Sequence, residues 1–242
     1  MKINKSSRKP LFLLISLVVL IIPFTTLSQN VYGIKGFVKI PDAEINDGHF
    51  SAGVFLINNN HVFDLKFNDE QLLGNSTLVY YASLGFLPFI EMSFRGTKIG
   101  TRGEALGDRM LNLKIKLSSE RSEFFPSISL GMNDVSQSRN EVETQNFHST
   151  YLVLTKNIDS YFPIKIVFGY GIKIFKSKSY DLLGCWYGIG VYPMVNSRIS
   201  LEYDAKYVNV GFDYKIFDMI KLSFHYYRIK YIGIGCNIDC AL

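Results

Sequence analysis

The chain has 242 residues, 48% of them hydrophobic and 14% aromatic, with a formal net charge of +5. Four of the 26 basic residues and none of the 21 acidic ones lie in the first 28 positions, which leaves 22 basic against 21 acidic residues and a formal charge of +1. A nearly neutral chain lacks the basic excess that nucleic-acid-binding proteins use to attract phosphates, and we exclude nucleic acid as a partner.

The N-terminus has the layout of a cleaved signal peptide. Four basic residues precede an apolar run at 11–24, and small and polar residues continue to Ser28. An uncleaved anchoring helix is the alternative, but Ser16 and Pro23 interrupt the run, which is shorter than the roughly 20 apolar residues that a spanning helix needs. We therefore expect residues 1–28 to be a signal peptide that directs export.

A segment at 29–49 then leads into one domain at 50–242, where apolar and polar residues alternate with the period of two that is typical of strands. In 110–117, for example, apolar residues at 111, 113, 115 and 117 alternate with Asn112, Lys114 and Lys116. Similar segments predict roughly a dozen strands and no convincing helix, at 50–57, 61–67, 77–85, 90–95, 110–117, 127–132, 147–156, 163–173, 183–192, 199–204, 208–214, 219–227 and 230–237.

The strand pattern indicates an all-β fold, an antiparallel transmembrane β-barrel of about 12 strands, with 10 or 14 as alternatives. A soluble sandwich also has a polar face, so alternation alone does not separate the two architectures. The signal peptide and unequal connections favour the barrel, as do aromatic residues near strand ends, which would form the girdles of a membrane barrel: Phe86, Phe89, Tyr161, Phe162, Tyr192 and Phe217.

Connections of two lengths are expected at the two rims of the barrel. In the bacterial arrangement the long loops would face outside the cell, which we state as a hypothesis. The sequence predicts short connections at 85–88, 192–197 and 215–219, and long polar ones at 96–109, 134–146 and 175–180.

A polar patch is expected inside the barrel. Glu91 and Arg95 share one strand face, and Asn112, Lys114 and Lys116 share a face of the next, so a hairpin would bring them together in the lumen. The patch could select solutes or contact a polysaccharide. Alternatively, it is a charge network that fills and rigidifies a narrow barrel.

No catalytic residue, metal site or cofactor is predicted. Ser223 and His225 share a strand face, but positions two apart lie roughly 7 Å apart, too far for direct proton transfer. The cysteines are an odd number for an exported chain, and a bridge between Cys236 and Cys240 is possible.

The order of several short motifs resembles the YjbH-type outer-membrane proteins associated with exopolysaccharide and capsule production. The resemblance spans roughly residues 33–238. It rests on Gly36-Phe37-Val38-Lys39-Ile40-Pro41-Asp42-Ala43 with Asp47-Gly48, Leu84-Gly85-Phe86-Leu87-Pro88 with Glu91 and Arg95, Gly107-Asp108-Arg109 with Lys114 and Glu120, Asp134, Tyr151-Leu152-Val153 with Lys156, and Glu202-Tyr203-Asp204.

This resemblance implies a non-enzymatic outer-membrane component of exopolysaccharide secretion or cell-envelope assembly. Its expected partners are outer-membrane lipid, polysaccharide and envelope export components. The alternatives are a small-solute channel, a barrel-embedded lipid hydrolase and a soluble periplasmic β protein. Together, strand pattern and resemblance assign these residues to a lumen network: Glu91, Arg95, Asp108, Arg109, Lys114, Lys116, Glu120, Asp134, Lys156 and Glu202.

Overall fold

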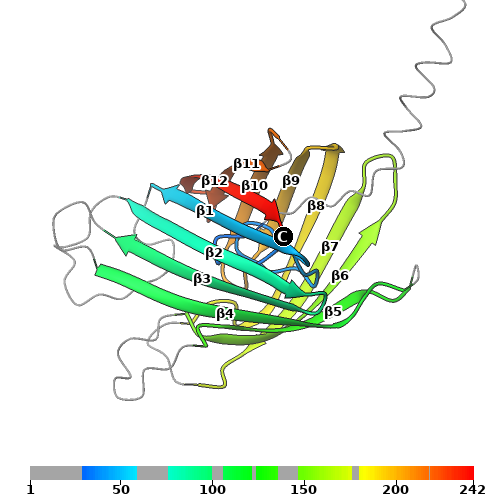
Figure 1. Cartoon of the computed structure of the whole chain (residues 1–242), viewed down its shortest axis with the longest axis horizontal. Coiled ribbons are helices and arrows are strands. Elements are labelled where there is room, and N and C mark those ends of the chain that lie inside the picture. Colours follow the sequence, from blue (N-terminus) through cyan, green and yellow to red (C-terminus); the bar gives the residue numbers. More distant parts are fainter. Residues whose placement is uncertain are drawn as a thin grey trace, which may run out of the picture.

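Twelve antiparallel strands form one closed barrel (Figure 1). The computed structural model describes residues 29–58, 76–99, 106–121, 124–135, 147–175, 180–217 and 219–242, with the backbone alone at 99 and 106–108. The strands are β1 (His49–Ile57), β2 (Thr77–Leu87), β3 (Ile90–Ile99), β4 (Leu106–Ser118), β5 (Ser127–Asn133), β6 (Ser149–Ile158), β7 (Ile164–Ile172), β8 (Gly184–Met194), β9 (Ser197–Tyr203), β10 (Val208–Lys215), β11 (Ile220–Tyr227) and β12 (Tyr231–Ala241).

The structure confirms the all-β, twelve-strand prediction, although the segment at 61–67 lies outside the described residues. The loop predicted at 96–109 is wrong at both ends. Gly96 pairs with Arg109 and Ile99 with Leu106, so the β3–β4 hairpin continues through residues whose polar composition suggested a loop. Within the described residues there is no helix long and apolar enough to cross a membrane.

Each strand pairs with its neighbour in sequence, so the connections alternate between two rims. We call the rim with the turns at 88–89, 195–196 and 216–219 the short-turn rim, and the opposite one the long-loop rim. The three predicted long connections all follow odd-numbered strands and therefore share the long-loop rim, as expected.

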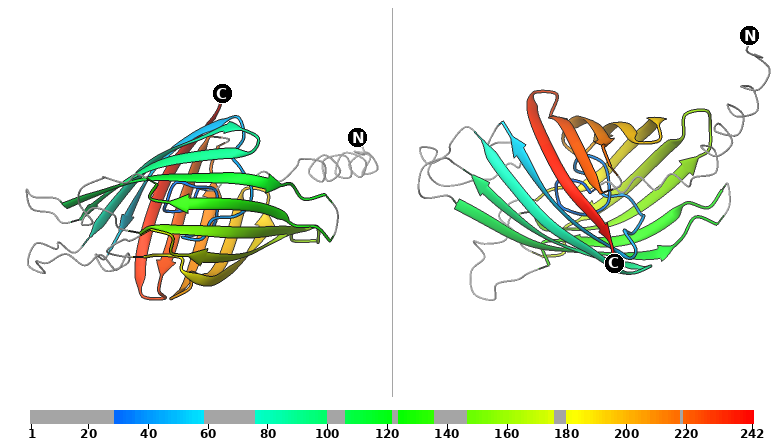
Figure 2. Two further views of the ribbon diagram at one scale, coloured as in Figure 1. Left: turned by 90° about the horizontal axis from the view of Figure 1, so that it is seen from below. Right: turned by 45° about the horizontal axis from the view of Figure 1, so that its top comes forward.

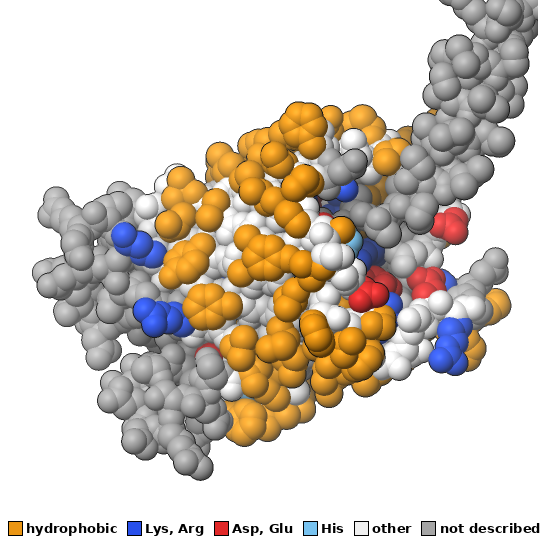
Figure 3. All heavy atoms as spheres, in the orientation of Figure 1, with side chains coloured by type: hydrophobic (Ala, Val, Ile, Leu, Met, Phe, Trp, Pro, Cys, Tyr) orange, Lys and Arg blue, Asp and Glu red, His pale blue; other side chains and the backbone are white. Residues whose placement is uncertain are grey.

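The outer wall of the barrel is apolar and the inner wall polar. On β11, for example, Phe224 and Tyr226 are exposed, whereas Ser223 and His225 are buried in the interior. Figure 3 shows hydrophobic side chains spread over the wall that faces the viewer. A water-soluble protein rarely exposes so large a contiguous apolar surface, which is what a lipid-facing barrel presents.

The girdle prediction requires exposed aromatic residues near a rim, and five of its six residues are exposed near the short-turn rim. It is wrong for Tyr192, which is only 6% exposed. Trp186, Gly188 and Gly190 on β8 also point inward, and Tyr192 follows them in the same alternation. Position near a strand end therefore does not determine which wall a side chain joins.

Residues 29–47 lie inside the barrel, where Figure 2 shows them as dark blue loops within the ring of strands. The sequence predicted only that this segment leads into the barrel. Val31, Phe37, Val38 and Ile40 are fully buried there and form the hydrophobic core together with inward-facing strand residues. We call residues 29–47 the plug.

Pairing of β1 with β12 closes the barrel and leaves no free sheet edge. Val54 lies directly opposite Cys236, and both side chains are on the outer wall. The bridge considered between Cys236 and Cys240 does not form, and both thiols are free. Four residues along a strand span about 13 Å, which is beyond the reach of a disulfide.

We predict that Val54→Cys forms a disulfide with the native Cys236 under mild oxidation. Directly opposed residues of an antiparallel pair have Cα atoms about 4.5–5.5 Å apart, within the range of disulfides. After boiling in SDS, the oxidised variant should migrate faster than its reduced form, and Val54→Cys combined with Cys236→Ser should show no such difference. The variant has four cysteines, so the bridge leaves two free thiols, at Cys185 and Cys240; four free thiols in the oxidised, folded single variant would contradict the β1–β12 closure.

Candidate functional site

The plug is a compact coil with hydrogen bonds of its own. The Asn30 side chain accepts hydrogen bonds from the backbone N–H groups of Tyr32 and Ile34, and its amide donates to the carbonyl of Lys39. Gly36 lies in a tight turn, where a Cβ atom would come within 2.2 Å of the Ile40 carbonyl oxygen. The glycine that opens the motif at 36–43 is thus required by the fold of the plug.

Glu202 on β9 binds the middle of the plug. Its carboxylate accepts hydrogen bonds from the backbone N–H groups of Val38, Lys39 and Ile40 at 3.0, 2.8 and 3.2 Å. The side-chain amide of Asn209 donates to the same carboxylate at 2.9 Å. Three consecutive N–H groups directed at one anion form a concave anion site built by the plug backbone.

Lys39 is the plug's main cationic contact with the same wall. Its ammonium lies 2.8 Å from carboxylate oxygens of both Asp181 and Asp204, and all three side chains are buried. The Tyr32 hydroxyl donates to Asp181 as well. Each buried charge in this group therefore has an opposite charge or a hydrogen-bond donor beside it, as burial requires.

On β3 and β4 the inner wall holds a second charged group. Lys114 lies 2.8 Å from Glu91 and donates to the backbone carbonyls of Lys35 and Asp42. Glu91 also accepts a hydrogen bond from the backbone N–H of Lys35. Asp42 in turn is 2.8 Å from Lys165 on β7. The hairpin contact predicted between Glu91 and Lys114 therefore exists, with the plug as its third member.

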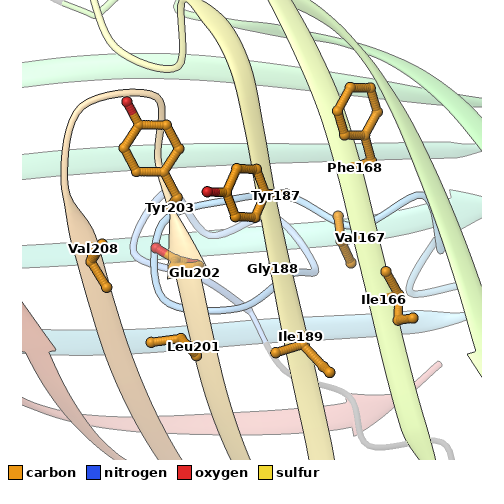
Figure 4. A pocket seen from close by; sticks show the side chains of 10 residues that line it. All are labelled: Ile166, Val167, Phe168, Tyr187, Gly188, Ile189, Leu201, Glu202, Tyr203 and Val208. Carbon is orange, nitrogen blue, oxygen red and sulfur yellow. The ribbon is translucent and has the colours of Figure 1, made fainter.

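These two charged groups lie on opposite walls, because β3 and β9 are six positions apart in a closed ring of twelve strands. Glu202 binds backbone N–H groups of plug residues 38–40, whereas Glu91 and Lys114 bind backbone atoms of Lys35 and Asp42. The plug therefore crosses the lumen and is attached on both sides. Figure 4 shows it as a pale blue ribbon behind β8 and β9.

A third group connects β9, β10 and β11. Arg198 binds Asp213 through two nitrogens at 2.6 and 3.1 Å and donates to the carbonyl of Gly36 at 2.8 Å. Ser223 donates to Asp213 at 2.6 Å, and His225 Nε2 lies 3.5 Å from the same carboxylate. Ser223 and His225, the pair considered for hydrolysis, thus both contact Asp213 beneath the plug.

Two further residues of the predicted network are buried near the long-loop rim. The Arg95 guanidinium lies over the rings of Tyr32 and Phe147, 4.7 and 5.3 Å from their centroids. Asp134 is 2% exposed, and its backbone N–H donates to the Asn112 side chain. The structure therefore places both in the interior, where Arg95 contacts the plug through Tyr32 and Asp134 contacts the wall through Asn112.

Arg109 requires a correction. It pairs with Gly96 beside the inward-facing pair of Arg95 and Met110, so Arg109 belongs to the outer wall, and its side chain is exposed. The charge of the residue suggested the lumen, but strand alternation decides the direction. The Asp108 backbone pairs with Thr97, and its side chain lies outside the described part.

Glu120 and Lys156 form an ion pair with each other outside the lumen, at the short-turn rim. Lys156 pairs with the exposed Ile166, which places it on the outer wall. Burial alone would raise the pKa of Glu120, but hydrogen bonds from Lys156 and Asn157 outweigh it and the net pKa is lowered. The pair braces the β4–β5 connection onto β6.

Lys116 remains on the inner wall at this rim, 2.9 Å from Glu44 of the plug. Burial raises the pKa of Glu44, as does the nearby Asp42, but hydrogen bonds from Lys116 and Ser127 contribute to a net lowering.

Among the described residues, no group of three or more histidine, cysteine or acidic side chains could hold a metal ion.

Sequence reasoning missed the plug residues Lys39 and Asp42 and their partners Asp181, Lys165 and Arg198. One signal was available: charged residues at 35, 39 and 42 are separated by two or three uncharged residues, most of them apolar, in a segment without strand periodicity. A polar inner wall of the barrel needs partners for its charges, and this segment could have been proposed to supply them.

Fold and site together define a closed, twelve-stranded antiparallel β-barrel whose lumen holds its own N-terminal segment. The comparison with protein families matches residues 28–181 to the YjbH family, described as exopolysaccharide biosynthesis protein YbjH. The chain belongs to this family. The match covers the plug and β1 to β7 and ends at Asp181, the partner of Lys39. No curated protein matches the sequence significantly.

We predict that Glu202→Ala lowers the free energy of unfolding by about 3 kcal/mol, because three buried N–H groups lose their acceptor. Glu202→Gln keeps a carbonyl oxygen as acceptor, so its free energy of unfolding should fall by less than that of Glu202→Ala. Fluorescence of the single tryptophan, Trp186, which is buried in the lumen, reports unfolding in detergent as denaturant is added. Equal stability of wild type and Glu202→Ala would show that these hydrogen bonds do not hold the plug.

Proposed function

We propose that the protein is a non-enzymatic outer-membrane β-barrel that contributes to exopolysaccharide secretion or cell-envelope assembly, with its lumen closed by the plug in the resting state. The observation that carries the proposal is the combination of an apolar outer wall on a closed barrel with a polar lumen whose charged side chains bind an internal segment.

Several features support an outer-membrane location. Every strand of the barrel carries exposed apolar side chains on its outer face. The closed ring has no edge strand whose backbone N–H and C=O groups would be left without partners in lipid. The expected signal peptide at 1–28 would direct export, after which a barrel folds into the membrane. Aromatic residues near the short-turn rim fit an interfacial girdle.

The exopolysaccharide role rests on the family to which the chain belongs. Capsule polysaccharide and envelope export components are the partners that this role implies. The lipid-hydrolase alternative gains no support from the site, because the Ser223 hydroxyl donates to Asp213 and His225 Nδ1 bonds the Tyr227 hydroxyl instead of the serine. A small-solute channel would need a lumen that the plug does not cross.

Fractionation of the native protein tests the location. We expect recovery with the outer membrane and extraction by detergent but not by high salt. On SDS gels, boiled and unboiled samples should migrate at different positions. A salt-soluble periplasmic protein without this mobility difference would favour the soluble β alternative.

A deletion strain should lose surface polysaccharide and regain it with the wild-type gene, and unchanged polysaccharide would contradict the proposed role.

Conductance in planar bilayers separates the closed barrel from the channel. We expect the wild-type protein to show no lasting conductance and a variant without residues 30–45 to show stepwise conductance, because the polar lumen would then be open to water. The variant counts only if it keeps the heat-dependent mobility shift. Should it not fold, Glu202→Ala with Lys114→Ala weakens both attachments instead. Equal, high conductance of wild type and variant would support the channel.

A further inference from the structure

A groove on the outer wall of the barrel lies over β7 to β10, on the opposite side of this wall from the plug. It has a volume of about 400 Å³, within the range of small-ligand pockets. Its side chains, labelled in Figure 4, come from β7, β8, β9 and β10. Val167, Gly188 and Glu202 contribute only its floor, since residues at these positions face inward.

Two rows of apolar side chains line the groove. The first row consists of residues that lie opposite one another on successive strands: Phe168, Tyr187, Tyr203 and Val208. The second row, farther from the long-loop rim, consists of Ile166, Ile189 and Leu201. The rings of Tyr187 and Tyr203 lie 5.4 Å apart. The Tyr203 hydroxyl donates to the carbonyl of Ala205, so the polar end of this side chain is directed to the long-loop rim. The groove is thus apolar in depth and polar towards the rim.

Basic residues stand at the rim end of the groove. Lys206 and Tyr207 lie in the turn that joins the groove residues Tyr203 and Val208, and the Arg228 guanidinium stacks over the Tyr207 ring at 3.9 Å. Lys206 is exposed and donates to the carbonyl of Tyr180. The acidic residue of the same turn, Asp204, is buried against Lys39. The exposed charge of this turn is therefore positive.

We propose that the groove binds an acyl chain of an anionic phospholipid whose phosphate lies at Lys206 and Arg228. The inference rests on the proposed membrane location. An apolar groove that opens towards cations matches the two ends of such a lipid, whereas the remainder of the apolar wall needs only bulk lipid. Charge-assisted hydrogen bonds from lysine and arginine to phosphate make the recognition selective for an anionic headgroup.

Native mass spectrometry of the purified protein, released from detergent after mixing with phosphatidylglycerol or phosphatidylcholine, tests the proposal. We expect one retained phosphatidylglycerol and little phosphatidylcholine. Lys206→Gln with Arg228→Gln should weaken phosphatidylglycerol binding about tenfold. Leu201→Trp should abolish it by filling the groove. The matched controls are Lys98→Gln, an exposed cation at the same rim on β3, and Ile234→Trp, an exposed apolar residue on β12.

Equal retention of the two lipids, or equal effects of the control and groove variants, would overturn the proposal. Each variant must keep the heat-dependent mobility shift, so that loss of folding is not mistaken for loss of binding. The measurement uses protein in detergent and does not depend on where the native protein fractionates or on polysaccharide. If the protein binds phosphatidylglycerol selectively but fractionates as a salt-soluble protein, the proposed lipid binding in the groove stands and the proposed membrane location is wrong.

Discussion

Charged side chains on the inner wall of the barrel must find partners away from bulk water, and the plug supplies them. Glu202, Lys114 and Arg198 each bind a backbone group of the plug, whereas Asp181 and Lys165 pair with its charged side chains. A buried charge without such a partner costs several kcal/mol, so barrel and plug depend on each other for stability. The closed lumen follows from this mutual requirement.

The outer wall obeys the opposite constraint. Its exposed side chains are mainly apolar, as the proposed position against lipid requires, and closure of the ring leaves no edge strand. The two constraints meet in every strand, because neighbouring side chains point to opposite walls. Hence Arg109 faces outward although Met110 beside it is buried, and Tyr192 faces inward although it lies near a rim.

The same mutual requirement bears on function. A plug attached to opposite walls, through Glu202 on β9 and Lys114 on β4, can leave only if both attachments break together. This arrangement fits the proposal that the plug keeps the lumen closed. It also gives the motif at 36–43 a structural reason, since those residues carry most of the contacts to the wall.

The sequence by itself determined the strands and, through their period of two, the inner-wall positions of Glu91, Lys114 and Glu202, because alternation is a local property of the chain. Only the tertiary structure decided what those side chains contact. The partners of Lys165 and Glu202 are 123 and 164 residues away, at Asp42 and Val38, and closure of the ring brings them together. The plug has no periodicity of its own, since its conformation is set by the wall around it, and the groove exists only where four strands lie side by side.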